Sequence, residues 1–151
     1  MAKTVLIARP HTFIVSDMKP FLEESGFETG KLENIDDLQR RVAGVSGAVI
    51  SLALSSSVAD SAEGVFLKLM KAAPKVPVLF ASMLSFQQAR SGLERIASSS
   101  GVQVNLVSLE ATPVEASLLG RQETFLYLSK DDLSSTERRA LASRLVQRHF
   151  R

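Results

Sequence analysis

Polar side chains that could bind a charged group follow the apolar segments of this chain. Serine ends four of these segments, at Ser51, Ser82, Ser108 and Ser129. Lys130 directly follows the last of them. When strands run parallel, their carboxyl ends meet at one edge of the sheet, and ligands bind there. A simpler explanation is that serine only begins loops and caps helices in these places.

A further set of residues could bind an anion. These residues are Arg9, His11, Ser55, Ser56, Ser57 and Lys130. The three serines lead into an expected helix, and the backbone amides and dipole at the beginning of a helix favour negative charge. Against an anion or nucleotide site, the chain contains no glycine-rich phosphate loop of the Walker or dinucleotide-binding type.

The sequence lacks the patterns of common enzyme and metal sites. It has no Gly-x-Ser-x-Gly segment, which would place a serine nucleophile on a sharp turn. It contains no cysteine, and its two histidines, His11 and His149, lie at opposite ends of the chain, so no histidine–cysteine metal motif can form. We therefore expect a protein that is not an enzyme and that uses no metal or cofactor.

The spacing of apolar residues predicts strands and helices in alternation. Strands are expected at 4–8, 27–32, 48–52, 76–82, 102–108 and 124–128. Helical patterns follow them, starting near 16, 34, 57, 85, 112 and 134. Because parallel strands need crossover connections, this alternation predicts an open, mostly parallel sheet of five to six strands with helices on both faces. The fold class is thus a three-layer αβα sandwich, with the uncharged run 47–54 as its buried strand.

Length and composition indicate a soluble, cytoplasmic protein of one domain, 1–151. Hydrophobic residues make up 45% of the 151 residues and charged residues 23%, which is typical of a globular domain. The N-terminus lacks the apolar region of a signal peptide. No apolar run approaches the ~20 residues that a membrane crossing needs.

The distribution of charge gives little support for nucleic acid as a partner. The net charge of +2 is too small to imply it. Five arginines lie in the last fourteen residues. The helix expected there must also bury Leu141, Leu145 and Val146, so we expect these arginines to form its solvated face.

Several segments resemble the receiver domain of bacterial two-component response regulators. They resemble, in chain order, the opening strand (3–7), the end of the first helix with its turn (21–28), the third strand (47–52), the third helix (63–71), the fourth strand with its hydroxyl end (76–82) and the last strand with its lysine (125–130). The resemblance implies a flavodoxin-like fold and a role in bacterial signalling.

The resemblance also implies that the phosphorylation chemistry of the family is lost. The family uses an acidic pair after the first strand to hold magnesium, an aspartate after the third as phosphoryl acceptor, a hydroxyl after the fourth and a lysine after the last. The corresponding positions here are Arg9, Pro10, Ser51, Ser82 and Lys130. No carboxylate remains for magnesium, and a serine cannot form an acyl phosphate. We expect aspartyl phosphorylation to be absent.

The interval between Ser82 and Lys130 is about one helix–strand unit longer than in the family. Residues 102–120 are the expected extra unit after the fourth strand. A second alignment makes Ser108 the family's hydroxyl instead of Ser82. Both alignments remain open.

Two functions follow as hypotheses. The first is a degenerate, phosphorylation-independent receiver that acts as a protein-interaction module, with another protein or a second copy of the chain as partner. Its candidate partner surface is Tyr127, Leu133, Arg138 and Arg144, although Tyr127 and Leu133 could instead cover the sheet. The alternative is a small anion- or nucleotide-binding domain with a basic pocket at the carboxyl ends of the strands.

Overall fold

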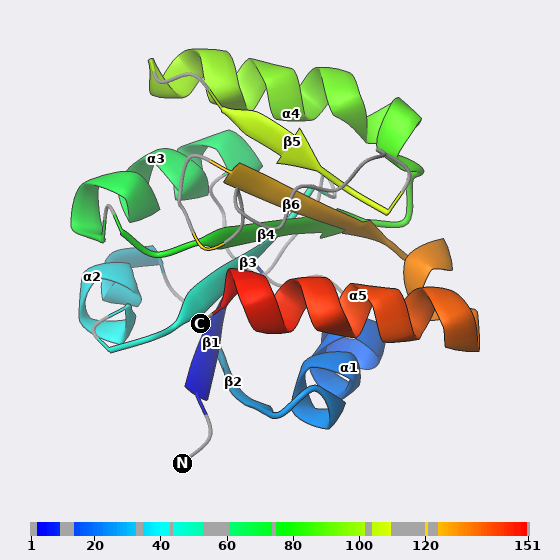
Figure 1. The fold of residues 1–151 in the computed structure, drawn as a ribbon. Helices are drawn as coiled ribbons and strands as arrows, with labels where there is room; N and C mark the ends of the chain where they lie inside the picture. Colours follow the sequence, from blue (N-terminus) through cyan, green and yellow to red (C-terminus); the bar gives the residue numbers. More distant parts are fainter. Residues whose placement is uncertain are drawn as a thin grey trace.

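The computed structural model describes residues 3–9, 14–32, 35–42, 44–52, 61–73, 75–101, 104–109, 120 and 124–150. Six strands in these residues form one sheet: β1 (Lys3–Arg9), β2 (Phe27–Lys31), β3 (Gly47–Ser51), β4 (Val78–Ser82), β5 (Asn105–Val107) and β6 (Thr124–Ser129). Their order is β2-β1-β3-β4-β6-β5, and every pairing is parallel (Figure 1). The predicted open parallel sheet is confirmed.

Helices cover both faces of the sheet (Figure 1). On one face lie a π-helical segment (Ile14–Met18), α1 (Lys19–Glu24) and α5 (Thr136–His149). On the other face lie a 3₁₀ turn (Ile35–Asp37), α2 (Leu38–Arg41), α3 (Ala62–Ala72) and α4 (Phe86–Ser100). Two separate apolar cores, one under α1 and α5 and one under α2, α3 and α4, confirm the three layers.

Serine side chains cap the N-termini of the longer helices. Ser85 Oγ accepts a hydrogen bond from Gln88 N, and Ser85 N donates to Gln88 Oε1, so the two residues form a capping box at the predicted helix start. Ser135 caps α5 through Arg138 N. The predicted start of α3 near Ser57 is wrong, because the helix begins after Ser61, whose Oγ accepts from Gly64 N.

The first helical stretch changes type before its proline. The π-helical segment ends at Met18, and α1 begins at Lys19 with Pro20 in its first turn. Because a helical segment precedes Pro20, its missing N–H removes one possible intrahelical hydrogen bond, and the helix changes type at this point. The interruption at Pro20 thus takes the form of a π-to-α transition.

The additional strand lies at the edge of the sheet. β6 pairs with β4, and β5 pairs with the far side of β6. Ser82 is level with Ser129 in this register. Ser82 follows β4, which lies between β3 and β6, whereas Ser108 follows the edge strand β5 and is separated from β3 by two strands. The sheet order therefore favours Ser82 as the hydroxyl next to both Ser51 and Lys130. The helix expected at 112–120 lies outside the described residues, apart from Gly120.

The C-terminal end of α5 packs over the beginning of β3. Phe150 is fully buried, and a Cβ added to Gly47 would lie only 2.0 Å from its ring. A glycine is required here by this close approach. Among the described parts of the chain, no helix combines the length and the apolar character needed to span a membrane.

Candidate functional site

The carboxyl ends of four strands bring several predicted site residues together. Arg9 ends β1, and its Nη1 donates to the carbonyl oxygen of Ser51 at the end of β3, at 2.8 Å. On the neighbouring strands, Lys130 N donates to the carbonyl oxygen of Ser82 at 3.1 Å. The structure thus places Arg9, Ser51, Ser82 and Lys130 at one edge of the sheet. Pro10, His11, Ser55, Ser56 and Ser57 lie outside the described residues.

A β-bulge directs the Arg9 side chain. Ile7 pairs with Val49, but Arg9 pairs with Ile50, so two residues of β1 oppose one residue of β3. In a regular strand, Arg9 would share the face of Ile7, which packs in the core under α1 and α5. The bulge places Arg9 opposite Ile50, which belongs to the core under α3 and α4. Bulges commonly redirect side chains near functional sites.

Arg9 is a buried cation. Its side chain is only 3% exposed, and burial lowers the pKa of Arg9 from its ordinary value. The ordinary pKa of arginine is so high that the guanidinium stays charged at neutral pH. A fixed positive charge therefore occupies the position where the family resemblance expects an acid. Within the described residues, no cluster of three histidine, cysteine, aspartate or glutamate residues could hold a metal.

The two serines at the family's reactive positions are enclosed. Ser51 is 1% exposed and Ser82 is 7% exposed. Ser82 Oγ accepts from Leu84 N at 3.1 Å and lies 2.5 Å from Tyr127 Oη. Tyr127 Oη donates its single proton to the carbonyl oxygen of Leu84 at 2.6 Å, so Ser82 must donate to Tyr127. The Ser82 hydroxyl therefore donates its only proton to Tyr127 and accepts from Leu84 N in the turn between β4 and α4.

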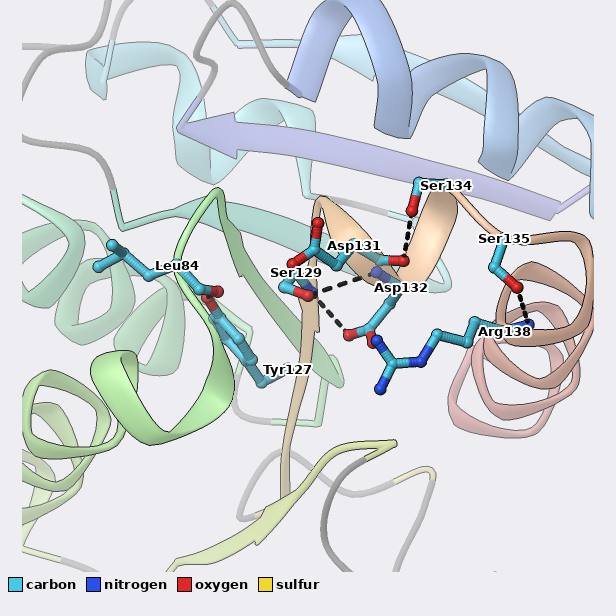
Figure 2. A network of polar contacts seen from close by, with 8 residues as sticks. All are labelled: Leu84, Tyr127, Ser129, Asp131, Asp132, Ser134, Ser135 and Arg138. Atoms are coloured by element: carbon cyan, nitrogen blue, oxygen red, sulfur yellow. Dashed lines mark hydrogen bonds and ion pairs between the residues drawn. The ribbon is translucent and has the colours of Figure 1, made fainter.

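A tight turn after β6 positions Lys130. The 3₁₀ turn Asp131–Leu133 follows Lys130 directly. Ser129 N donates to Oδ2 of Asp132 in this turn at 2.9 Å (Figure 2). Asp132 is 3% exposed, and its other oxygen, Oδ1, lies 3.8 Å from Arg138 Nη1 at the beginning of α5. This ion pair links the turn to α5 without a hydrogen bond, while the Lys130 side chain is exposed.

Arg9 and Lys130 line two different cavities. Lys130 lines one of about 260 Å³ next to α1 and α5, together with Asp17 and Arg139. Arg9 lines one of about 430 Å³ between α3 and α4, together with Arg95. The anion-binding set predicted from the sequence is thus divided in the structure. Sequence reasoning missed Arg95, although Gln88, Ser91 and Arg95 recur at helical spacing, which indicates one polar face of α4.

The structure leaves only part of the candidate partner surface exposed. Tyr127 is fully buried and Leu133 is 7% exposed, so both cover the sheet and neither can face a partner. Arg138 and Arg144 are exposed. Leu141, predicted to be buried, is 50% exposed and lies between them at three-residue intervals. These three residues, Arg138, Leu141 and Arg144, form an exposed stripe along α5, which we call the α5 stripe.

His149 has a structural role. It is fully buried, with Nε2 2.9 Å from the carbonyl oxygen of Val78 and Nδ1 accepting from Gly120 N at 3.0 Å. The neutral ring satisfies both contacts when its proton is on Nε2. Burial lowers the pKa of His149 to about 4, and the hydrogen bond to Val78 opposes this only in part.

Comparisons with known proteins identify the fold. No family model matches the sequence, and a comparison with curated proteins finds no relative. Among solved structures, the receiver domain of a sensor histidine kinase from Pseudomonas aeruginosa PAO1, with a magnesium ion in its active-site cleft, has a TM-score of 0.60 and 11% identity, covering 99% of this chain and 98% of that one.

Two further solved structures show the same likeness. A response regulator receiver protein from Sinorhizobium medicae has a TM-score of 0.55 and 14% identity, over 98% of this chain and 94% of that one. NtrX from Brucella abortus has a TM-score of 0.53 and 16% identity over 97% of this chain, which spans 29% of NtrX. The chain has a receiver-like, flavodoxin-type α/β fold.

Proposed function

We propose that this chain is a receiver-like module that acts through protein contacts in bacterial two-component signalling and is not phosphorylated on an aspartate. The observation that carries the proposal is the contact between the Arg9 guanidinium and the Ser51 carbonyl at 2.8 Å. A buried cation there repels magnesium, which binds carboxylate oxygens in proteins. Ser51 offers no carboxylate for an acyl phosphate, and the Ser82 hydroxyl is already hydrogen-bonded.

Such a module would transmit its signal through a surface that contacts another protein. The α5 stripe combines a half-exposed leucine with two arginines, and this composition suits an acidic partner with an apolar centre, or a second copy of the chain. Replacing Leu141 with glutamate should leave the fold intact and weaken the association. Sedimentation velocity of the wild type and this variant tests the second copy as partner; unchanged association in the variant would exclude the stripe.

A phosphoryl mimic tests the loss of phosphorylation. Beryllofluoride with magnesium is added to isotope-labelled protein, and the amide signals of residues 51, 82 and 130 are followed by NMR. We expect no magnesium-dependent shift. The receiver domain of the Pseudomonas aeruginosa kinase, whose structure holds a magnesium ion, serves as the positive control. A saturable, magnesium-dependent shift at Ser51 would contradict the proposal.

A second candidate function is anion binding at the carboxyl ends of the strands. The observation that favours it is Arg9 itself, a buried guanidinium that lines a cavity. The separation of Arg9 from Lys130 into two cavities argues against the original set of residues. Anion binding that is weakened by replacing Arg9 but unaffected by Lys130→Ala is the expected result, and binding that depends on neither residue would exclude this candidate.

A further inference from the structure

We propose that the cavity between α3 and α4 binds a small phosphorylated organic molecule of about nucleotide size. The proposal rests on the second candidate function, anion binding at Arg9. It places the site beside Arg95 of α4 and away from Lys130. This cavity, the α3–α4 cavity, is lined from four directions: the end of β1, the residue after β3, the first turn of α3 and one face of α4.

The size and walls of the α3–α4 cavity suit an organic ligand. Its volume of about 430 Å³ lies within the range of about 300–1,000 Å³ that is typical of small-molecule sites. Leu52, Ala89 and Ile96 provide an apolar wall. An inorganic anion alone would leave this wall without a partner, whereas a ligand with an apolar or aromatic body would cover it.

Two arginines supply the positive charge. Arg9 reaches the cavity from the sheet because of its bulge, and it is 3% exposed. A guanidinium has five N–H donors. Arg95 lines the same cavity from the exposed side of α4, and within the described part of the chain it forms no ion pair. A charged ligand here would meet one buried and one exposed guanidinium, and each planar guanidinium can donate to two phosphate oxygens at once.

Neutral donors add to the two cations. Ala62 and Glu63, in the first turn of the eleven-residue helix α3, line the cavity. The amides of a first helical turn lack intrahelical acceptors and attract negative charge. Gln88 and Ser91 line it from α4 with an amide and a hydroxyl. The Gln88 amide and the Ser91 hydroxyl can bind phosphate oxygens without adding net charge.

One carboxylate in the lining of the α3–α4 cavity further restricts which ligands could bind there. Glu63 lines the cavity, and its Oε1 accepts a hydrogen bond from the Ser99 hydroxyl. Its negative charge offsets the attraction of the neighbouring α3 amides, so we expect the phosphate on the side of Arg9 and Arg95. A carboxylate can accept further hydrogen bonds, for example from sugar hydroxyls. Phosphate, hydroxyls and an apolar body together describe a nucleotide.

Calorimetric titration of the full chain tests the proposal. The probes are adenosine monophosphate, guanosine monophosphate, inorganic phosphate and adenosine, the last as an uncharged control. We expect at least one nucleotide to bind more tightly than inorganic phosphate and than adenosine. Arg95→Ala should weaken that binding about tenfold or more, the loss expected for one charge-assisted hydrogen bond.

Arg90→Ala is the matched control, because it removes the same charge from the same helix at a residue that pairs with Glu94 and lines a different cavity. We expect it to leave the affinity unchanged. Equal losses in both arginine variants would reveal only a general charge effect and would overturn the site. NMR signals of 62–64 and 88–95 should move on nucleotide addition; shifts confined to other segments would also overturn it.

Arg9→Gln separates this site from the broader function. Losses in both Arg9→Gln and Arg95→Ala support the α3–α4 cavity. A loss in Arg9→Gln alone would leave anion binding at Arg9 standing and overturn the cavity. If no probe binds the wild-type protein, both proposals are wrong. Because Arg9 contacts Ser51, thermal unfolding must show that the Arg9 variant folds, and the wild-type NMR shifts decide the question if it does not.

Discussion

At the scale of single residues, hydrogen-bonded side chains hold the strand ends in place. Tyr127 Oη connects Ser82 to the Leu84 carbonyl. Tyr127→Phe and Ser82→Ala should each lower the free energy of unfolding by about 1–3 kcal/mol, because each leaves a buried group without its partner. Chemical denaturation measures these losses. In the double variant the combined loss should be smaller than the sum; strict additivity would show that the two hydroxyls do not act as one unit.

His149 makes stability depend on pH. Its folded-state pKa of about 4 lies below the ordinary 6.5, so folding favours the neutral ring. The resulting stability is complete above pH 6.5 and is lost as the pH falls through 4. A shift of this size corresponds to about 3 kcal/mol. His149→Gln provides the reference, since other titrations cancel in the difference between the two proteins. A difference that stays constant between pH 7 and 4 would contradict this role.

At the scale of elements, the sequence predicted features that depend on neighbouring residues, but it did not predict how one element packs against another. Ser85 with Gln88 identified the start of α4, because a capping box involves only four neighbouring residues. Ser57 and Ser61 offer similar caps, and the sequence alone does not choose between them. Val65, Phe66 and Leu69 of α3 are buried against the sheet, and this packing selects the register that begins after Ser61.

The bulge in β1 and the burial of Tyr127 also depend on packing that the sequence alone does not show. The segment 6–9 contains no glycine or proline that would indicate a bulge. The bulge is visible only in the pairing of β1 with β3. Arg9 was identified as a site residue, but the cavity it lines was not. Tyr127 was a candidate for the partner surface, with burial against the sheet as the alternative; the acceptor that allows its hydroxyl to be buried, Leu84, is remote in sequence.

The packing of α5 on β3 gives a prediction at this scale. A Cβ at Gly47 would overlap the Phe150 ring, so Gly47→Ala should displace the end of α5 and destabilise the protein by about 1–3 kcal/mol. Gly92→Ala is the control, since nothing lies within 4 Å of the added Cβ and helical alanine should stabilise by roughly 0.5–1 kcal/mol. Thermal unfolding compares them. Equal unfolding midpoints of the two variants would show that the Phe150 ring can move aside without loss of stability.

At the scale of the whole molecule, a receiver-like sheet carries a positive charge at its strand ends. The order of β2, β1, β3, β4 and β6 places Arg9, Ser51, Ser82 and Lys130 along one edge. If the scaffold is that of a receiver and only the charge is inverted, carboxylates at Arg9 and Ser51 should restore magnesium binding. The double variant Arg9→Asp/Ser51→Asp should therefore melt at a higher temperature when magnesium is added.

The size of this effect follows from binding linkage. Magnesium at 100 times its dissociation constant stabilises the folded state by about 2.7 kcal/mol, which for a domain of this length raises the midpoint by roughly 5–10 °C. Ser51→Asp alone should show no rise, because the Arg9 guanidinium would neutralise the new carboxylate. A rise in the wild type would contradict the inverted charge. No rise in the double variant would mean that the likeness of fold does not extend to the positions of the side chains at the strand ends, where the bulge at Arg9 alters the register.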